Sequence, residues 1–139
     1  MSTPPAPMGP IQAAYYGRLT GDEDLKALIT GVFDHVPEGQ AYDYVVIGEA
    51  TEIPNNEHGR LGRETTQTIH VWSKHRGYSR GLAIASRITA LLDHQPLIIA
   101  GLHHVSTKFE FQQTLTDPKP PGDLRHIPMR FRTVTEQES

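Results

Sequence analysis

The sequence contains no cysteine, which excludes disulfide cross-links, thiolate metal sites and cysteine nucleophiles. It also lacks any apolar run close to the roughly 18–20 residues that cross a membrane as a helix. The first residues have neither a basic region nor an apolar core, so we expect no signal peptide and a soluble cytoplasmic product. Positive charge is not in excess, because 16 acidic residues outnumber 13 Lys and Arg and give a net charge of -3. No overall basic field is therefore available to attract nucleic acid.

Apolar residues are scarce as well, at 37 % of the 139 residues. The length suits one domain with a modest core. So low an apolar fraction indicates either long polar loops or a chain that completes its burial against other subunits. The Pro-rich residues 1–9 and the C-terminal residues 135–139 carry no periodic pattern, and we expect both to be flexible tails. Residues 10–134 are predicted to form the single domain.

A strand followed by a helix forms the centre of the predicted fold. Residues 63–72 are rich in β-branched and aromatic side chains and contain no Gly or Pro, which predicts a strand. After a break at residues 73–77, residues 78–93 carry apolar side chains at helical spacing. Gly81 and Ala85 lie on the apolar stripe of this helix and permit a close approach to a sheet. The helix is therefore predicted to pack back on the sheet that the strand enters.

The remaining elements are shorter or less regular. A helix is predicted from Pro10, and the capping-box pattern at residues 20–23 predicts a second helical piece. Three further strands are predicted at residues 42–53, 102–115 and 124–134. The last contains Pro128, which places this strand at a sheet edge or at a bulge.

The predicted fold class is α+β in the order α-β-β-α-β-β. It has a single sheet of four to five strands, mainly antiparallel or mixed, with the helices packed on one face.

Two segments are candidate contact sites. The loop between the first two predicted strands is rich in turn formers and charge, and it is longer than an ordinary hairpin connection. It consists of Pro54, Asn55, Asn56, Glu57, His58, Gly59, Arg60 and Leu61. A basic cluster lies at the turn before the central helix, where it is either solvated or contacts phosphate or an acidic protein surface. Its members are Lys74, His75, Arg76 and Arg80.

We predict no catalytic, cofactor-binding or metal-binding site. Among eight histidines only His103 and His104 are adjacent, and neighbours in a strand point to opposite faces. There is no H-E-x-x-H and no phosphate-cradling glycine series. Glu49, Glu52 and Glu64 could meet on paired strands, but strand carboxylates are usually solvated. The alternative is a small enzyme or ligand-binding α+β domain whose histidines line a pocket.

Several short motifs, taken in their order and spacing, resemble one known family. They are Asp34-His35-Val36-Pro37, Tyr44-Val45-Val46-Ile47-Gly48-Glu49-Ala50, Thr68-Ile69-His70-Val71-Trp72-Ser73, Arg76-Gly77, Ala83-Ile84-Ala85 and Leu91-Leu92. Over roughly residues 10–134 the chain resembles the tail-completion family of long-tailed bacteriophages. These are the tail terminators, or tail-to-head joining proteins, which also occur in prophages and gene transfer agents.

The resemblance implies a structural virion protein that is assembled in the host cytoplasm and located at the head–tail interface. It implies a ring, usually a hexamer, that caps the tail tube, stops its polymerisation and joins the tail to the head connector. Implied partners are further copies of the chain, the major tail tube protein, a head-completion or connector protein, and DNA passing through the ring; no membrane is involved. A net negative charge suits a channel through which DNA must slide without binding.

We assign tube docking to the loop at residues 54–62, and ring contacts to the helix at 78–92 and the strand at 102–115. The alternatives within the same machine are another ring of the head–tail connector and the tube subunit itself.

Overall fold

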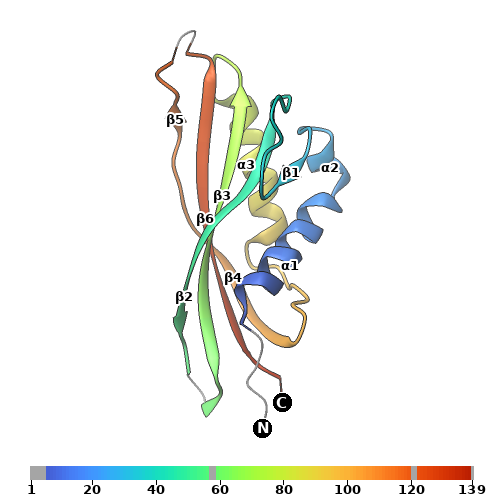
Figure 1. Cartoon of the computed structure of the whole chain (residues 1–139), viewed down its shortest axis with the longest axis vertical. Coiled ribbons are helices and arrows are strands. Elements are labelled where there is room, and N and C mark those ends of the chain that lie inside the picture. Colours follow the sequence, from blue (N-terminus) through green and yellow to red (C-terminus); the bar gives the residue numbers. More distant parts are fainter. Residues whose placement is uncertain (1–5, 57–58, 120–121, 139) are drawn as a thin grey trace.

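The computed structural model of the chain describes residues 6–56, 59–119 and 122–138. Within these residues the chain forms three helices and one mixed sheet of six strands (Figure 1). The elements are α1 (Met8–Thr20), α2 (Glu23–Lys26), β1 (Val32–Phe33), β2 (Tyr44–Pro54), β3 (Gly62–Lys74), α3 (Ser79–Leu92), β4 (Leu102–Gln112), β5 (Leu115–Thr116) and β6 (Leu124–Gln137). The α+β class and the location of helices on one sheet face are as predicted.

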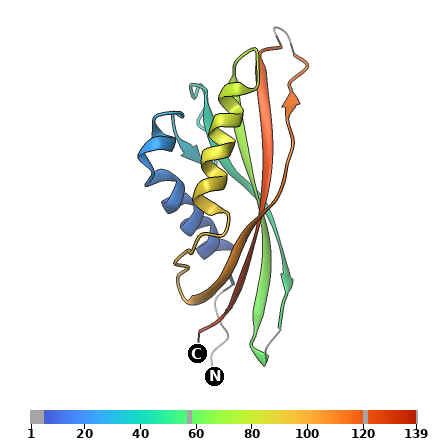
Figure 2. The same ribbon diagram turned by 180° about the vertical axis from the view of Figure 1, so that it is seen from behind.

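The strand order in the sheet is β1-β2-β3-β6-β4, with β5 beside β6. β1 runs parallel to β2, and the other neighbouring strands of the described residues pair antiparallel. β6 comes last in the chain but lies between β3 and β4. Figures 1 and 2 show that the helices cover only one face, and that the β2–β3 hairpin extends beyond them at the lower end of the molecule. No helix of the described residues covers the opposite face of the sheet.

The core lies between this sheet and helices α1 and α3. The buried stripe of α3 matches the sequence prediction and comprises Gly81, Ile84, Ala85, Ile88 and Leu92. Gly81 lies at the closest approach of the helix to the sheet, where a Cβ atom would lie 2.9 Å from the Cδ1 atom of Ile127 on β6. α1 contributes the buried Ile11, Tyr15 and Leu19. Together these side chains fix both helices against the inner face of the sheet.

The sheet has more strands than the four to five predicted, and their order along the chain differs. β1 and β5 contain two residues each, which is too short to give an alternating pattern in the sequence. The predicted helical pieces also differ in detail. Asp22, rather than Thr20, caps α2 by accepting a hydrogen bond from the backbone N–H of Leu25 at 2.9 Å. Asp22 also pairs with Arg87, which ties α2 to α3.

The boundaries of the two tails lie closer to the chain ends than expected. α1 begins at Met8, inside the segment predicted to be a flexible tail. β6 continues to Gln137, past the predicted end of the domain at residue 134.

Pro128 does not mark a sheet edge, which overturns one of its two predicted positions and leaves the other, an irregularity in the strand pairing. It pairs with His70 inside the long β3–β6 ladder. Its carbonyl oxygen accepts a hydrogen bond from the backbone N–H of Gln113, so the backbone polar groups of Pro128 face the break between β4 and β5. The missing N–H of proline therefore falls where the neighbouring strand is interrupted, and an interior strand tolerates it.

Candidate functional site

The two predicted contact segments lie at opposite ends of the molecule. The loop of residues 55–61 follows β2 and precedes β3, whereas the basic turn follows β3 (Figure 1). β3 has 13 residues. At about 3.3 Å per residue it separates the two segments by roughly 40 Å. One subunit can therefore contact different partners at its two ends.

The base of the loop is anchored to its own strands and to β6. The backbone N–H of Asn55 donates to the carbonyl oxygen of Gly62 at 3.0 Å, and the N–H of Gly62 donates to the side-chain oxygen of Asn56 at 3.0 Å. Leu61 exchanges hydrogen bonds with Gln137 of β6. Pro54 is the last residue of β2, and Glu57 and His58 lie outside the described residues. The loop ends are thus held in place beside two exposed apolar side chains, Ile53 and Leu61.

Gly62→Ala is expected to disturb this loop base. A Cβ atom at position 62 would lie 2.0 Å from the carbonyl oxygen of Asn55 and 3.0 Å from that of Thr135, so the backbone itself must move. We expect a loss of about 2 kcal/mol in the free energy of unfolding, measured by urea denaturation. Gly59→Ala is a poor control because Gly59 has a φ of 74°. Gly17→Ala serves instead, since a Cβ atom there meets nothing within 4 Å. Equal stability of the two variants would contradict the expected clash.

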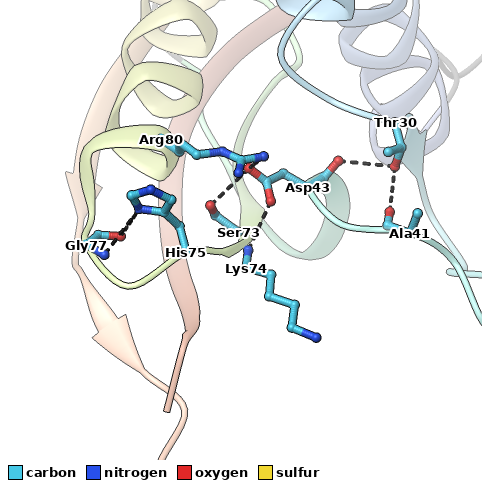
Figure 3. A network of polar contacts seen from close by, with 8 residues as sticks. All are labelled: Thr30, Ala41, Asp43, Ser73, Lys74, His75, Gly77 and Arg80. Carbon is cyan, nitrogen blue, oxygen red and sulfur yellow. Dashed lines mark hydrogen bonds and ion pairs between the residues drawn. The ribbon is translucent and has the colours of Figure 1, made fainter. Parts of the chain in front are cut away.

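A buried carboxylate organises the opposite end of the molecule. The side chain of Asp43 is 1 % exposed and accepts hydrogen bonds from the hydroxyl of Ser73 at 3.0 Å and the backbone N–H of Lys74 at 2.9 Å. The guanidinium of Arg80 pairs with the same carboxylate at 3.1 Å (Figure 3). The backbone of Thr30 donates to the carbonyl oxygen of Asp43 from the other side. Asp43 therefore connects the start of β2 to the end of β3 and the first turn of α3.

The structure divides the four predicted basic residues into two groups. Arg80 points toward Asp43 and His75 accepts a hydrogen bond from the backbone N–H of Gly77, so both hold the turn in shape (Figure 3). Lys74 and Arg76 are exposed. Only these last two are available to contact an acidic surface or phosphate. Asp43 was not identified from the sequence, since a single acid before a strand carries no pattern.

The uncovered face of the sheet carries a second polar group that the sequence did not reveal. Nε2 of His70 lies 2.6 Å from Oε1 of Glu49, and its Nδ1 lies 2.7 Å from Nε2 of His126. The ring of His126 stacks on Trp72 with 3.9 Å between ring centroids. The hydrogen bond from His70 lowers the pKa of Glu49. Burial, and next the charge of His70, lower the pKa of His126. His126 is thus kept neutral beside its neighbours near neutral pH.

The fluorescence of Trp72, the only tryptophan, is expected to report the protonation of His126. A charged imidazole in ring contact quenches indole emission, so emission should fall with a midpoint below the ordinary histidine value of about 6.5. Because the folded-state pKa is lowered, the stabilising contribution is complete above that ordinary value and is lost as pH falls through the folded-state pKa. The His126→Gln variant should show no such transition. A wild-type midpoint above 6.5, or an unchanged transition in the variant, would contradict the stacked geometry.

The β4 edge of the sheet displays apolar side chains. Val105 is 48 % exposed and Phe109 is 38 % exposed. Two outward backbone groups of this edge are already bonded: the N–H of Phe109 donates to Asp93 at 2.9 Å, and the carbonyl oxygen of Thr107 accepts from the N–H of His94 at 2.8 Å. The half-buried strand predicted at residues 102–115 is thus more exposed than its alternation suggested. At these two positions the edge cannot pair with an added strand.

The described residues contain no group of three or more His, Cys, Asp or Glu that could hold a metal ion. His103 and His104 line an open hollow of about 810 Å³ together with Arg60 and Glu138. His104 is engaged within it, because its Nδ1 accepts a hydrogen bond from the backbone N–H of Leu97. No helix in the described part of the chain is long and apolar enough to span a membrane.

An elongated α+β fold with the two predicted contact segments at opposite ends is the form expected of a structural assembly component. The comparisons identify the particular family. The family described as tail completion protein gp17 matches residues 13–136. The chain is 30 % identical over 125 residues to the tail completion protein gp17 of Bacillus phage SPP1, covering 87 % of this chain and 90 % of that one. The chain belongs to this family of tail completion proteins.

Two solved structures are similar to the fold. One is a chain of the virion of a native gene transfer agent particle, with a TM-score of 0.82 and 28 % identity, covering 94 % of this chain and 98 % of that chain. The other is the gp17 protein of bacteriophage SPP1, with a TM-score of 0.61 and 26 % identity, covering 88 % and 86 % of the two chains. The protein is therefore a structural component of the virion tail and not an enzyme.

Proposed function

We propose that this protein is a tail terminator: a ring of identical subunits, most simply a hexamer, that caps the tail tube and stops its growth. The same ring joins the tail to the head connector and lets DNA pass through its centre. Membership of the tail completion family over residues 13–136 is the observation that carries this proposal. The likeness to a chain of a gene transfer agent virion supports a place within an assembled particle. Residues 10–134 act as the tail-terminator domain.

The separation of the contact segments supports a joint between two partners. We assign the tube protein to the loop of residues 55–61, where Ile53 and Leu61 provide exposed apolar surface. The head-completion or connector protein then faces the opposite end, where Lys74 and Arg76 are exposed and suit an acidic protein surface. A subunit that contacts both partners must span the distance between them. The 13-residue strand β3 extends between the two contact segments.

Contacts within the ring are assigned to α3 and β4. Both elements lie on the same side of the molecule, since β4 is the last strand of the sheet and α3 precedes it through the 93–101 turn. Leu82 on α3 and Phe109 on β4 are exposed apolar side chains on that side. Burying such side chains at an interface contributes about 25 cal/mol per Å² of apolar area.

The second candidate function within the virion tail is that of a tube subunit or another connector ring. Polymerisation of the purified protein discriminates a tube subunit from a terminator. The purified protein at high concentration, followed by native mass spectrometry and light scattering, should stop at one closed ring or remain a small species that assembles only on tubes. Long tubes formed by the protein alone would identify it as a tube component and contradict the terminator proposal.

A further inference from the structure

The sheet has a second edge that is suited to self-association. The strand order places β1 and β2 at one edge and β4 at the other. A head-to-tail contact between identical subunits joins two different patches, one from each subunit. The α3–β4 side provides one such patch, so the opposite edge is where its complement should lie.

An apolar groove runs along that opposite edge, between α1 and β1. Its volume is about 420 Å³, and its floor is formed by Val32 of β1 and Ile47 of β2. Ala13 and Tyr16 of α1 form one wall, and Tyr16 is 49 % exposed. A second hollow of about 340 Å³ shares Tyr16 and Val32 and continues the groove toward α2. The groove is thus long enough to take more than one side chain of a partner strand.

The β4 edge has the features of an occupant for this groove. Phe109 contacts Phe131 edge-on at 5.8 Å between ring centroids and leaves its other side exposed. Val105 lies at a register shift of the β4–β6 pairing, where an extra residue turns the strand outward. Because Asp93 and His94 already bond the N–H of Phe109 and the carbonyl oxygen of Thr107, these two groups are not available to pair with an added strand. A side-chain ridge entering a groove fits this edge better than strand addition.

The charges beside the two surfaces have opposite signs. Lys108 precedes Phe109 on the exposed β4 edge, with its side chain on the opposite face of the strand, and it forms no ion pair with another described residue. Asp34 lines the groove, is exposed, and likewise forms no ion pair within the described part of the chain. Bringing the two surfaces together would place a cation opposite an anion, which favours this register over others.

We propose that the groove between α1 and β1 receives the β4 edge of a second copy of this chain, with Phe109 in the groove and Lys108 facing Asp34. Repeating this contact around a closed set of subunits would produce the ring. The inference rests on the proposed function only in taking from it that the ring closes. The contact is head-to-tail, because the two edges differ.

The absence of natural cysteines permits a direct test. The double variant Asp34→Cys with Lys108→Cys is oxidised at several protein concentrations and resolved without reductant. We expect a ladder of dimers, trimers and larger species, since each subunit links to two neighbours. The matched control is Asp34→Cys with Lys74→Cys, because Lys74 is exposed but lies at the end of the sheet. Each single-cysteine variant should give at most a low level of dimer. No ladder from the first pair, or equal ladders from both pairs, would overturn the proposal.

Charge exchange provides a second test that does not depend on cross-linking. Lys108→Glu and Asp34→Lys should each weaken self-association at least about tenfold, and the combined variant should recover to within about threefold of wild type. Failure of the combined variant to recover would contradict the assigned register. Analytical ultracentrifugation of the wild type distinguishes a failure of the groove contact from a failure of the proposed function. A wild-type oligomer without a ladder defeats the groove contact alone, whereas a protein that forms no ring alone or on tubes defeats the proposed function.

Discussion

Replacing Asp43 with alanine is expected to lower the free energy of unfolding by about 3 kcal/mol, which corresponds to a fall of roughly 10 °C in the melting temperature. The side chain is 1 % exposed and accepts hydrogen bonds from Ser73 and from the backbone N–H of Lys74. Its removal leaves these donors without their acceptor and leaves Arg80 without its counter-ion. Urea denaturation and differential scanning calorimetry give the two quantities.

Arg80→Ala is the matched control for this prediction. Arg80 is half-exposed, so water replaces much of the lost pairing and the expected cost is only about 1 kcal/mol. The Asp43→Ala variant should also loosen the turn between β3 and α3, which hydrogen exchange at Lys74 would detect. A loss below about 0.5 kcal/mol for Asp43→Ala would show that the buried carboxylate does not hold this end together.

Replacing residues 55–61 with a Gly/Ser segment of equal length is expected to weaken binding to tail tubes at least about thirtyfold, because losing one hot-spot side chain commonly costs about 2 kcal/mol or more. Self-association should change little, since the groove and the β4 edge lie elsewhere. Binding is measured by co-sedimentation of the protein with assembled tubes at a series of concentrations.

The control for the loop variant lies at the other end of the molecule. Lys74→Ala combined with Arg76→Ala removes the two exposed basic side chains there and should leave tube binding unaltered while weakening attachment to the head connector. If this control, rather than the loop variant, lost tube binding, the two ends would have to be assigned in reverse.

The sequence predicts the long elements well because their patterns are long. Thirteen residues of β3 and the buried stripe of α3 repeat their periods often enough to be recognised. The two-residue strands β1 and β5 have no period, and their pairing depends on neighbours distant in the chain. Pro128 left two alternatives open, a sheet edge or a bulge, and the choice depends on the break between β4 and β5 that no local pattern indicates.

The candidate sites show the same distinction between features visible in one stretch of sequence and features formed by residues distant in the chain. The loop of residues 55–61 could be located because turn formers and charge are visible in the sequence itself. The set of Glu49, His70 and His126 could not, because its members come from three strands that meet only in the folded sheet. Arg80 follows the basic turn in the sequence, but its partner Asp43 lies before a different strand, so the ion pair became apparent only in the fold.

The most direct test of the account is the length of tail tubes assembled with and without this protein, observed by negative-stain electron microscopy. The account predicts tubes that stop growing when the protein is added and that carry a ring at one end. Tubes that grow unchecked, with no protein bound at either end, would contradict the proposal that this tail completion protein is a terminator.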